Sequence, residues 1–374
     1  MGTIGKGKSI GEVLRAEIVS GKYDLTRKLP SDRMLMRRFS VARATVQTAM
    51  KELMDKKLVE RRPGYGTFLA DLAGTKAAQK FAMIVPDIYY PFYERICRGI
   101  SDAAKKRDWS ILSVSLGFGN MRERALRAVD FAGVCIRERV SGVFFQPLQF
   151  ITDSEKVNRD ILTFFKNANI PVVLLDSDFV APPNRSEYDL VGVDNTGIGY
   201  KMAKHVIAAG AKRIMYFSNP LPAPTSLKRG TGVGLAVTEA GLPWNRNNVY
   251  FADPTDTRAA ARVFAGRNRP DAIIAVNDHV ALQLLKTLTA IGKRVPDDVL
   301  LAGVNGDPDA AEAEPPLPTA VQPCYEIGTT AVSLMFERLA NPDSQPREVF
   351  LSARLEERRS TNPCKKSRKT RGKK

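Results

Sequence analysis

Apolar side chains recur at helical spacing in the first part of the chain and then at the spacing of strands. Residues 10–69 therefore predict three short helices followed by a β-hairpin. The helical stripes consist of Ile10, Val13, Leu14 and Ile18, then Leu35 and Phe39, then Val46, Met50, Leu53 and Met54. Ser31 follows a proline and is placed to cap the second helix. The hairpin is expected from runs 58–62 and 67–69, which flank a glycine-rich turn at 63–66.

Beyond residue 80 the pattern changes to short, continuous apolar runs that alternate with helical stretches. These runs are 81–85, 111–116, 142–145, 172–175, 190–193, 213–217, 272–276 and 299–302. Continuous hydrophobicity is typical of parallel strands that are buried on both faces, so we expect an α/β body. Residues 81–358 are too many for one sheet, which predicts two Rossmann-like lobes and a ligand cleft beyond the strand ends. The small and polar segment 71–80 reads as a linker.

Charge is distributed unevenly along the chain. The 374 residues include 57 Lys and Arg against 40 Asp and Glu, a formal net charge of +17. Residues 1–75 carry +7 and residues 360–374 carry another +7, which leaves only +3 on the long middle. A basic head and tail on a near-neutral body indicate a polyanionic partner. Two interpretations of the tail stay open: a solvated segment without a task, or a nonspecific phosphate contact that raises affinity for DNA.

The composition argues against several classes of protein. No apolar run reaches the ~18 residues of a membrane span, and the polar start of the chain predicts no signal peptide. The four cysteines are scattered without a C-x-x-C pair, so we expect neither disulfides nor a metal site. The expected location is the reducing cytoplasm. His205 and His279 lie in predicted helices and are interpreted as structural. No Walker loop, HExxH or G-x-S-x-G motif occurs, so we expect neither an enzyme nor a cofactor.

The third predicted helix carries a polar stripe opposite its apolar one. Arg43, Gln47 and Lys51 recur at intervals of one turn, so they share a face. Such a helix suits the major groove of DNA, where Arg pairs with guanine and Gln with adenine. The hairpin that follows would then form a wing against the DNA backbone or minor groove. The alternative is a basic three-helix bundle whose charges are merely solvated.

The order of these features resembles the GntR-type winged helix-turn-helix domain. The matching segments are Lys28-Leu29-Pro30-Ser31-Asp32-Arg33, Arg43-Ala44-Thr45-Val46 and residues 58–68, which cover most of 10–69. The resemblance implies that Arg33 and Arg43 read bases, that Thr45, Gln47 and Tyr65 contact phosphates or flanking bases, and that Gly64 lies at the wing tip. The chain departs from the family at Ala42, where a serine usually caps the recognition helix, and at Gln47, where arginine is frequent. Loss of that cap costs about 1 kcal/mol.

Polar and aromatic side chains follow several of the predicted strands of the body. An aromatic-rich segment, 86–93, follows the first strand, and Asp176, Asp194, Asn277 and Asn305 come at later strand ends. Aromatic faces together with carboxylates and amides suit a small polyhydroxylated ligand. The alternative is that the aromatics belong to the core and that the acids cap helices. For Asp194 and Asp278, which open helices, capping is the favoured interpretation.

The body is similar to the effector domain of LacI/GalR regulators, which itself resembles periplasmic sugar-binding proteins. The segments that carry this resemblance are 90–100, 170–176, 191–195, Arg229 with Gly232, and 269–278. The resemblance implies that Phe92 and Tyr93 stack on a ligand and that Asp176, Arg229 and Asn277 bind its hydroxyls. Asn305 stands where the family usually has an acid, which gives up charge-assisted strength, and Asp307 is placed to compensate. A GntR-type head on such a body resembles the arabinose-repressor (AraR) subgroup.

These resemblances, together with the composition of the tail, divide the chain into four parts: a DNA-binding domain at 1–70, the linker 71–80, a two-lobed effector-binding domain at 81–358 and a basic, disordered tail at 359–374. We expect a cytoplasmic homodimer that binds a double-stranded DNA operator and represses carbohydrate-use genes. A sugar or sugar derivative between the lobes would control its affinity for the operator. The alternative is a DNA-binding regulator whose pocket has degenerated, because of Asn305, and which acts constitutively or through a protein partner.

Overall fold

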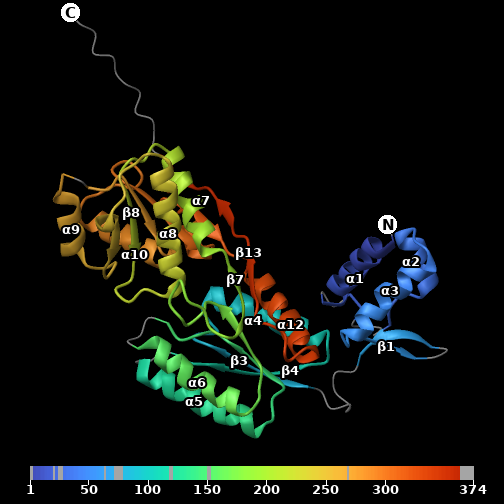
Figure 1. Cartoon of the computed structure of the whole chain (residues 1–374). Helices are drawn as coiled ribbons and strands as arrows, with labels where there is room; N and C mark the ends of the chain where they lie inside the picture. Colours follow the sequence, from blue (N-terminus) through green and yellow to red (C-terminus); the bar gives the residue numbers. More distant parts are fainter. Residues whose placement is uncertain are drawn as a thin grey trace, which may run out of the picture.

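The computed structural model describes residues 3–19, 22–23, 28–62, 65–70, 79–117, 121–149, 153–267 and 269–362. A small head of helices and a hairpin is joined to a body of two α/β lobes (Figure 1). Gly64 at the expected wing tip lies outside the described residues, as do 71–78 of the expected linker and 363–374 of the expected tail.

The head has the predicted order of elements. Helices α1 (Thr3–Val19), α2 (Asp32–Phe39) and α3 (Arg43–Asp55) precede the antiparallel pair β1 (Val59–Arg62) and β2 (Gly66–Leu69). Most residues of the predicted stripes form the core, in which Leu14, Leu35 and Val46 are completely buried, but Val13 is 39% exposed and lies outside it. Ser31 caps α2 by accepting a hydrogen bond from the Met34 amide at 3.4 Å, as predicted. Helix α1 begins seven residues before the apolar stripe that predicts it.

Lobe 1 is a parallel sheet with strand order β13-β7-β6-β5-β3-β4. Its strands are β3 (Lys80–Val85), β4 (Ser110–Ser115), β5 (Gly142–Phe145), β6 (Val172–Asp176), β7 (Asp189–Val193) and β13 (Glu348–Leu351). Helices α4 (Pro91–Lys105) and α12 (Cys324–Ala340) cover one face, and α5 (Met121–Arg137) and α6 (Ser154–Asn167) cover the other (Figure 1). Alternate residues of β3 therefore enter different cores: Phe81 and Met83 pack toward α4, and Ala82 and Ile84 pack toward α5.

Lobe 2 is a second sheet, with strand order β14-β12-β11-β10-β8-β9. Its strands are β8 (Ile214–Ser218), β9 (Val249–Phe251), β10 (Ala272–Ala275), β11 (Leu300–Asn305), β12 (Thr319–Val321) and β14 (Arg354–Glu356), of which β14 is antiparallel to β12. Its helices are α7 (Asn195–Ala208), α8 (Pro224–Glu239), α9 (Thr257–Ala265), α10 (Asp278–Ala290) and α11 (Pro308–Glu312), with short 3-10 turns at Arg246–Asn248 and Arg359–Thr361. Helices α7 and α8 approach so closely that a Cβ at Gly232 would lie 1.9 Å from the Thr196 carbonyl oxygen.

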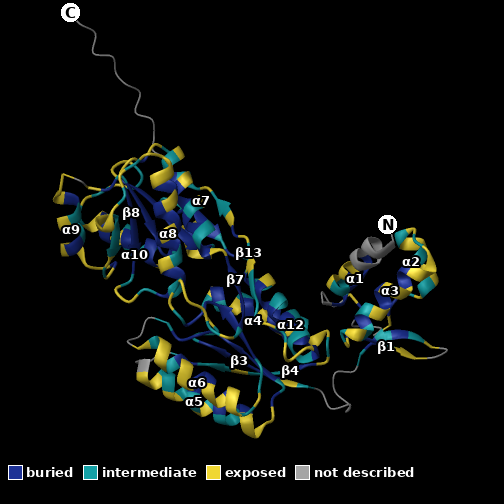
Figure 2. Cartoon of the chain, viewed as in Figure 1, coloured by how far each residue is buried: buried dark blue, intermediate teal, exposed yellow. Residues whose placement is uncertain are grey.

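The chain crosses between the lobes at Asp194, at Gln322–Pro323 and at Ser352–Ala353. These crossings bring the carboxyl ends of the strands of both sheets to the region between the lobes. Figure 2 shows the central strands of both sheets as buried and the outer helix faces as exposed, which confirms the interpretation of most apolar runs. The run 111–116 is an exception, because it forms the edge strand β4, whose residues are half-buried or exposed. The two-lobed α/β architecture predicted from the sequence is therefore present.

The head contacts lobe 1 through α1 and α12, which lie side by side in Figure 1. Arg15 on α1 forms an ion pair with Glu337 near the end of α12 at 2.5 Å, and Arg347 approaches the same carboxylate at 2.6 Å. Arg107, which follows α4, donates to the carbonyl oxygen of Ile18 at 3.3 Å. This contact connects the predicted DNA-binding head to the same lobe whose strand ends face the cleft.

Candidate DNA-binding surface and interlobe cleft

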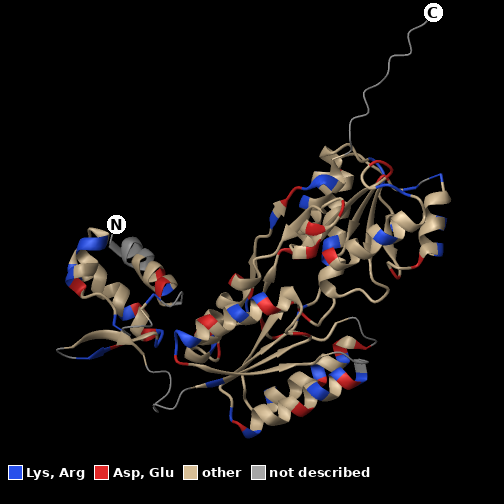
Figure 3. Cartoon of the chain, turned by 180° about the vertical axis from the view of Figure 1, so that it is seen from behind, with Lys and Arg blue, Asp and Glu red and all other residues tan. Residues whose placement is uncertain are grey.

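The polar stripe of α3 is exposed, as its spacing predicts. Arg43, Gln47 and Lys51 face solvent, whereas Val46 and Met50 are buried on the opposite side. Within the described ranges, no hydrogen bond or ion pair engages the three polar side chains. Ala42 occupies the N-cap of α3 and provides no side-chain hydrogen bond, which confirms that the usual cap is missing. Figure 3 shows Lys and Arg at many positions of the head and few acidic ones.

The other predicted DNA-contacting residues have different environments. Arg33 on α2 is exposed, and Tyr65 at the hairpin turn is 74% exposed, so both are accessible to DNA. Thr45 is only 6% exposed, which leaves its hydroxyl little access to a phosphate in this conformation. Two arginines of the wing are already paired: Arg61 contacts Asp32 at 2.8 Å, and Arg62 contacts Glu60. The accessible donors are therefore concentrated on α2, on α3 and at the turn.

Three predicted effector residues come from lobe 1. Phe92 and Tyr93 open α4 and form an edge-to-face pair whose centroids are 5.1 Å apart. Asp176 ends β6 with a positive φ of 63°, is 7% exposed, and its Oδ1 atom has no hydrogen-bond partner. Burial raises the pKa of Asp176 to about 6, although the positive charge of Arg229 opposes this rise. The charge of Arg229, which belongs to the other lobe, thus acts on Asp176.

Arg229 on α8 is buried and partly committed to lobe 2. Its Nε donates to Oδ1 of Asn195 at 2.7 Å, and its Nη1 donates to the carbonyl oxygen of Val276 at 2.6 Å. These bonds fix the guanidinium plane beyond the end of β10. The N–H donors on Nη2 remain to bind a ligand. Fewer donors of the guanidinium are therefore available to vicinal hydroxyls than the sequence suggests.

At the start of α10, the roles of ligand binding and helix capping fall on Asn277 and Asp278 differently from what the sequence predicts. Asn277, predicted to bind a ligand, is the N-cap, and its Oδ1 accepts from the Val280 amide at 2.8 Å, which leaves Nδ2 for a ligand. Asp278, predicted as a cap, instead accepts through Oδ2 from the amides of Gly306 and Asp307 at 2.9 Å. The capping interpretation was wrong for Asp278, because the buried carboxylate holds the loop after β11. It is confirmed for Asp194, which accepts from the Gly197 amide.

Asn305 and Asp307 reach across the cleft to lobe 1. The Tyr90 hydroxyl donates to Asp307 Oδ2 at 3.0 Å and accepts from Asn305 Nδ2 at 3.4 Å. Gln322, at one of the crossings, donates to Asn305 Oδ1 at 2.8 Å. Arg95 adds a hydrogen bond to the carbonyl oxygen of Gly306 at 3.3 Å. Asn305 itself adopts a φ of 132°, which few non-glycine residues adopt.

Tyr90, Arg95 and Gln322, which form this contact between the lobes, are not among the residues predicted for the site. Tyr90 stands in the aromatic segment before α4 and could have been included with its neighbours. For Arg95 and Gln322 the sequence holds no comparable signal, because their partners lie far away along the chain. His205 bonds to Thr361 Oγ1 at 2.8 Å, in agreement with a structural role, and His279 is exposed.

Several buried polar atoms near the strand ends lack hydrogen-bond partners. They include Oγ of Ser218 at the end of β8, Oε1 of Gln322, and the amide of Gln146 after β5 with Oδ1 of Asp176, two side chains that lie close enough to influence each other without forming a hydrogen bond of good geometry. Leaving such atoms unpaired is unfavourable, and a polar ligand would relieve it. The set contains both donors and acceptors, as binding of hydroxyl groups requires.

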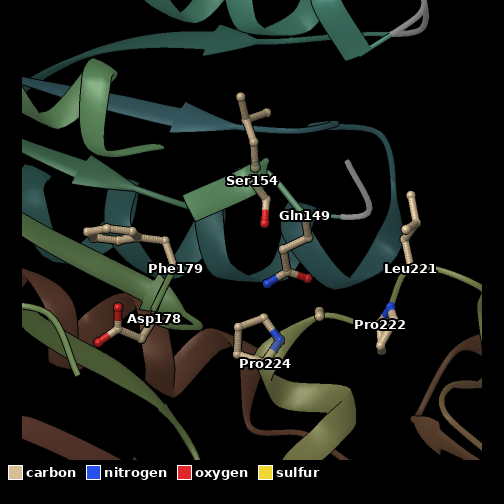
Figure 4. A pocket seen from close by; sticks show the side chains of 9 residues that line it. Gln149, Ser154, Asp178, Phe179, Leu221, Pro222 and Pro224 are labelled. Carbon is tan, nitrogen blue, oxygen red and sulfur yellow. The ribbon is translucent and has the colours of Figure 1, made fainter. Parts of the chain in front are cut away.

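A cavity of about 100 Å³ lies where loops of the two lobes meet. Figure 4 shows several of its lining side chains, which are Leu148, Gln149, Ser154, Asp178, Phe179, Leu221, Pro222, Ala223 and Pro224. None of the six predicted effector residues lines it. In the part of the chain that the structure covers, no helix is long and apolar enough to cross a membrane. Over the same residues, no cluster of His, Cys, Asp and Glu is arranged to hold a metal ion.

Comparisons with known proteins match both parts of the chain. Residues 6–69 match the gntR family of bacterial regulatory proteins, and residues 203–361 match a periplasmic binding protein-like domain. An arabinose metabolism transcriptional repressor of Halalkalibacterium halodurans is 24% identical and aligns with 95% of this chain and 96% of its own length. The transcriptional repressor PurR of Photobacterium profundum is 26% identical over 74% of this chain and 80% of its own.

Solved structures show the same fold. A transcriptional regulator CelR–cellobiose complex superposes with a TM-score of 0.65 at 23% identity, covering 86% of this chain and 91% of that one. The transcription regulator CcpA of Lactococcus lactis superposes with a TM-score of 0.63 at 22% identity, covering 76% of this chain and 99% of that one.

Proposed function

We propose that this chain, a DNA-binding transcription regulator with a gntR-type head and a periplasmic-binding-protein-like body, represses carbohydrate-use genes under the control of a sugar. The observation that carries the proposal is the exposed stripe of Arg43, Gln47 and Lys51 on α3, opposite a buried apolar face. The matched families are those of regulators and not of enzymes. We place the protein in the cytoplasm, where its DNA partner is found.

On the DNA side, we propose that α3 enters the major groove and that Arg43 and Arg33 contact bases. Gln47 and Tyr65 would contact phosphates or flanking bases, together with Thr45 if the head adjusts on binding. Two heads in a homodimer would read a pseudo-palindromic operator, because the symmetry of the protein imposes that of the site. We further propose that the head spans residues 1–70 and is joined by the linker 71–80 to the body.

On the effector side, we propose a sugar-like ligand between the lobes. Phe92 and Tyr93 would stack on it, and Asp176, Arg229, Asn277 and Asn305 would bind its hydroxyls. The unpaired buried atoms of Gln146, Asp176 and Gln322 support a polar ligand. The names of relatives support a sugar: one represses arabinose metabolism, and one solved regulator is in complex with cellobiose. Binding would alter the Tyr90–Asp307 contact and thereby the relative orientation of the lobes.

The experiment is a mobility-shift assay of the purified protein on a DNA fragment from its own promoter region, in physiological salt, with and without a panel of sugars. We expect a specific complex that one sugar dissociates. Salt must be fixed, because phosphate contacts make affinity strongly dependent on it. Absence of a specific complex, both here and in a genome-wide search for bound sites, would contradict the DNA-binding proposal.

A second candidate is a regulator that no sugar controls. Asn305 favours it, because both ends of its amide are occupied by Gln322 and Tyr90 and because it lacks the charge of the usual acid. Calorimetric titration with sugars and sugar phosphates separates the two candidates. Specific DNA binding without heat from any ligand would favour the second.

A further inference from the structure

We propose that the effector has at least two rings and that its second ring occupies the cavity between the loops, here called the outer subsite. The outer subsite is formed by Leu148, Gln149, Ser154, Asp178, Phe179 and residues 221–224. The inference rests on the proposed function, since it assumes a sugar between the lobes. It adds the size and chemical class of that sugar, a neutral glycoside.

Three loops that line the outer subsite are close in sequence to residues at the proposed inner site. Gln149 follows Gln146 after β5, and Phe179 follows Asp176 after β6. On the other side, residues 221–224 lead into α8, the helix that carries Arg229. Each wall therefore lies only a few residues from a side chain of the proposed inner site. A ligand held by Asp176 and Arg229 would meet this cavity as it extends away from them.

The volume of the cavity fits one ring. A water molecule occupies roughly 10–15 Å³ by the same measure, so about 100 Å³ corresponds to roughly seven to ten waters. That is the scale of one hexose ring with its hydroxyl groups. Four residues of the proposed inner site, Phe92, Asp176, Arg229 and Asn305, are at most 7% exposed and none of them lines this cavity, so the room for a further ring lies in the outer subsite.

The walls of the outer subsite combine apolar surface with a few hydrogen-bonding groups. Leu148, Phe179, Leu221 and two prolines supply the apolar surface. The Nε2 atom of Gln149 is buried without a hydrogen-bond partner, and Figure 4 shows its amide between Ser154 and Pro224. A sugar ring has the matching chemistry, because its C–H faces are apolar and its hydroxyls accept from an amide.

The charges of the residues that line the outer subsite do not suit a phosphorylated second ring. Among the described residues that line it, Asp178 is the only one with an ionisable side chain, and both of its carboxylate oxygens accept hydrogen bonds from the loop. Its oxygens accept from the amides of Val180 at 3.0 Å and Ser186 at 2.8 Å. The described lining residues include no Lys or Arg to balance a phosphate. The occupant is therefore neutral.

Calorimetric titration of the full chain tests the inference. The probes are cellobiose, maltose, lactose, sucrose, trehalose and melibiose, their constituent monosaccharides, and trehalose 6-phosphate. We expect at least one disaccharide to bind about tenfold more tightly than either of its monosaccharides, and the phosphate to bind no more tightly than trehalose. Equal affinity for a disaccharide and one of its monosaccharides would overturn the inference and leave the proposed function standing. No binding by any probe would also overturn the inference, whereas the proposed function is tested separately by the sugar panel of the mobility-shift assay.

Two variants locate the second ring. Leu221 is 48% exposed, so Leu221→Trp fills the cavity without disturbing a core. Gln149→Leu removes the amide group and keeps a side chain of similar size. Each should weaken binding of the disaccharide about tenfold and leave its monosaccharide within about twofold of wild type. The matched control is Leu235→Trp, because Leu235 is a 54% exposed leucine on α8 outside the cavity. Equal loss for both sugars, or no loss for either, would overturn the placement.

Discussion

At the scale of residues, Arg43 has the environment that base recognition requires. It opens α3, faces solvent and is free of ion pairs within the described residues, so its guanidinium is available to guanine. We expect Arg43→Ala to weaken operator binding by about 1–3 kcal/mol and to relax preference for one base pair. Competition binding with single-base operator variants measures both effects. Arg269→Ala in lobe 2 serves as a charge-matched control. If the variant Arg43→Ala discriminates between bases as wild type does at every operator position, Arg43 does not read a base.

Asp176 provides a pH-dependent test of the inner cleft. Because burial raises the pKa of its folded-state carboxyl from 3.8 to about 6, the native protein holds this proton more tightly than the unfolded chain. The stability of the free protein should therefore fall as pH rises from about 4 to 7, by at most about 3 kcal/mol from this group. Asp176→Asn should abolish that part of the decline.

The comparison of variant with wild type isolates Asp176, because Asp278 also has a raised pKa, of about 7, and titrates in both proteins. Chemical denaturation at several pH values gives the measurement. Asp160→Asn, at an exposed position on α6, should follow the wild-type curve. Parallel curves for wild type and Asp176→Asn would mean that Asp176 lies in a wetter environment than the structure indicates.

At the scale of elements, α3 lacks a side-chain cap, whereas Ser31 caps the preceding helix α2. Ala42 has the extended backbone of an N-cap but no side-chain oxygen to accept from the first turn. Ala42→Ser should stabilise the head by about 1 kcal/mol, since serine satisfies an amide that alanine leaves to solvent. The measurement is the free energy of unfolding by denaturant. Ala44→Ser, one residue inside α3, is the control and should give no gain.

Local spacing predicts the longer elements better than the short ones. The stripes of α2 and α3 and the buried runs of β3, β6 and β8 were visible because each repeats within a few residues. Strands such as β9 and β14 cover three residues with half-exposed positions, so no periodicity marks them. Local spacing also fails to predict contacts in the cleft between residues that are far apart in the sequence. Asp278 was read as a cap because its true partners, Gly306 and Asp307, are fixed by the approach of a distant loop.

At the scale of the whole molecule, α12 runs from the cleft to the head. It begins at Cys324, directly after the crossing in which Gln322 binds Asn305, and its last turns present Glu337 to Arg15 of α1. A rearrangement at the cleft that moves α12 would therefore move the head. Coupling of this kind is a free energy between two sites, typically 1–3 kcal/mol.

Glu337→Gln tests this connection, because it removes the charge that pairs with both Arg15 and Arg347 and keeps the shape of the side chain. We expect the affinity of the sugar to stay near wild type while the ratio of operator affinities without and with sugar falls about fivefold or more. Glu326→Gln, exposed in the first turn of α12, should leave that ratio unchanged. A wild-type ratio in Glu337→Gln would show that the signal passes from the body to the head by another route, since the ion pairs between α1 and α12 would then carry none of it.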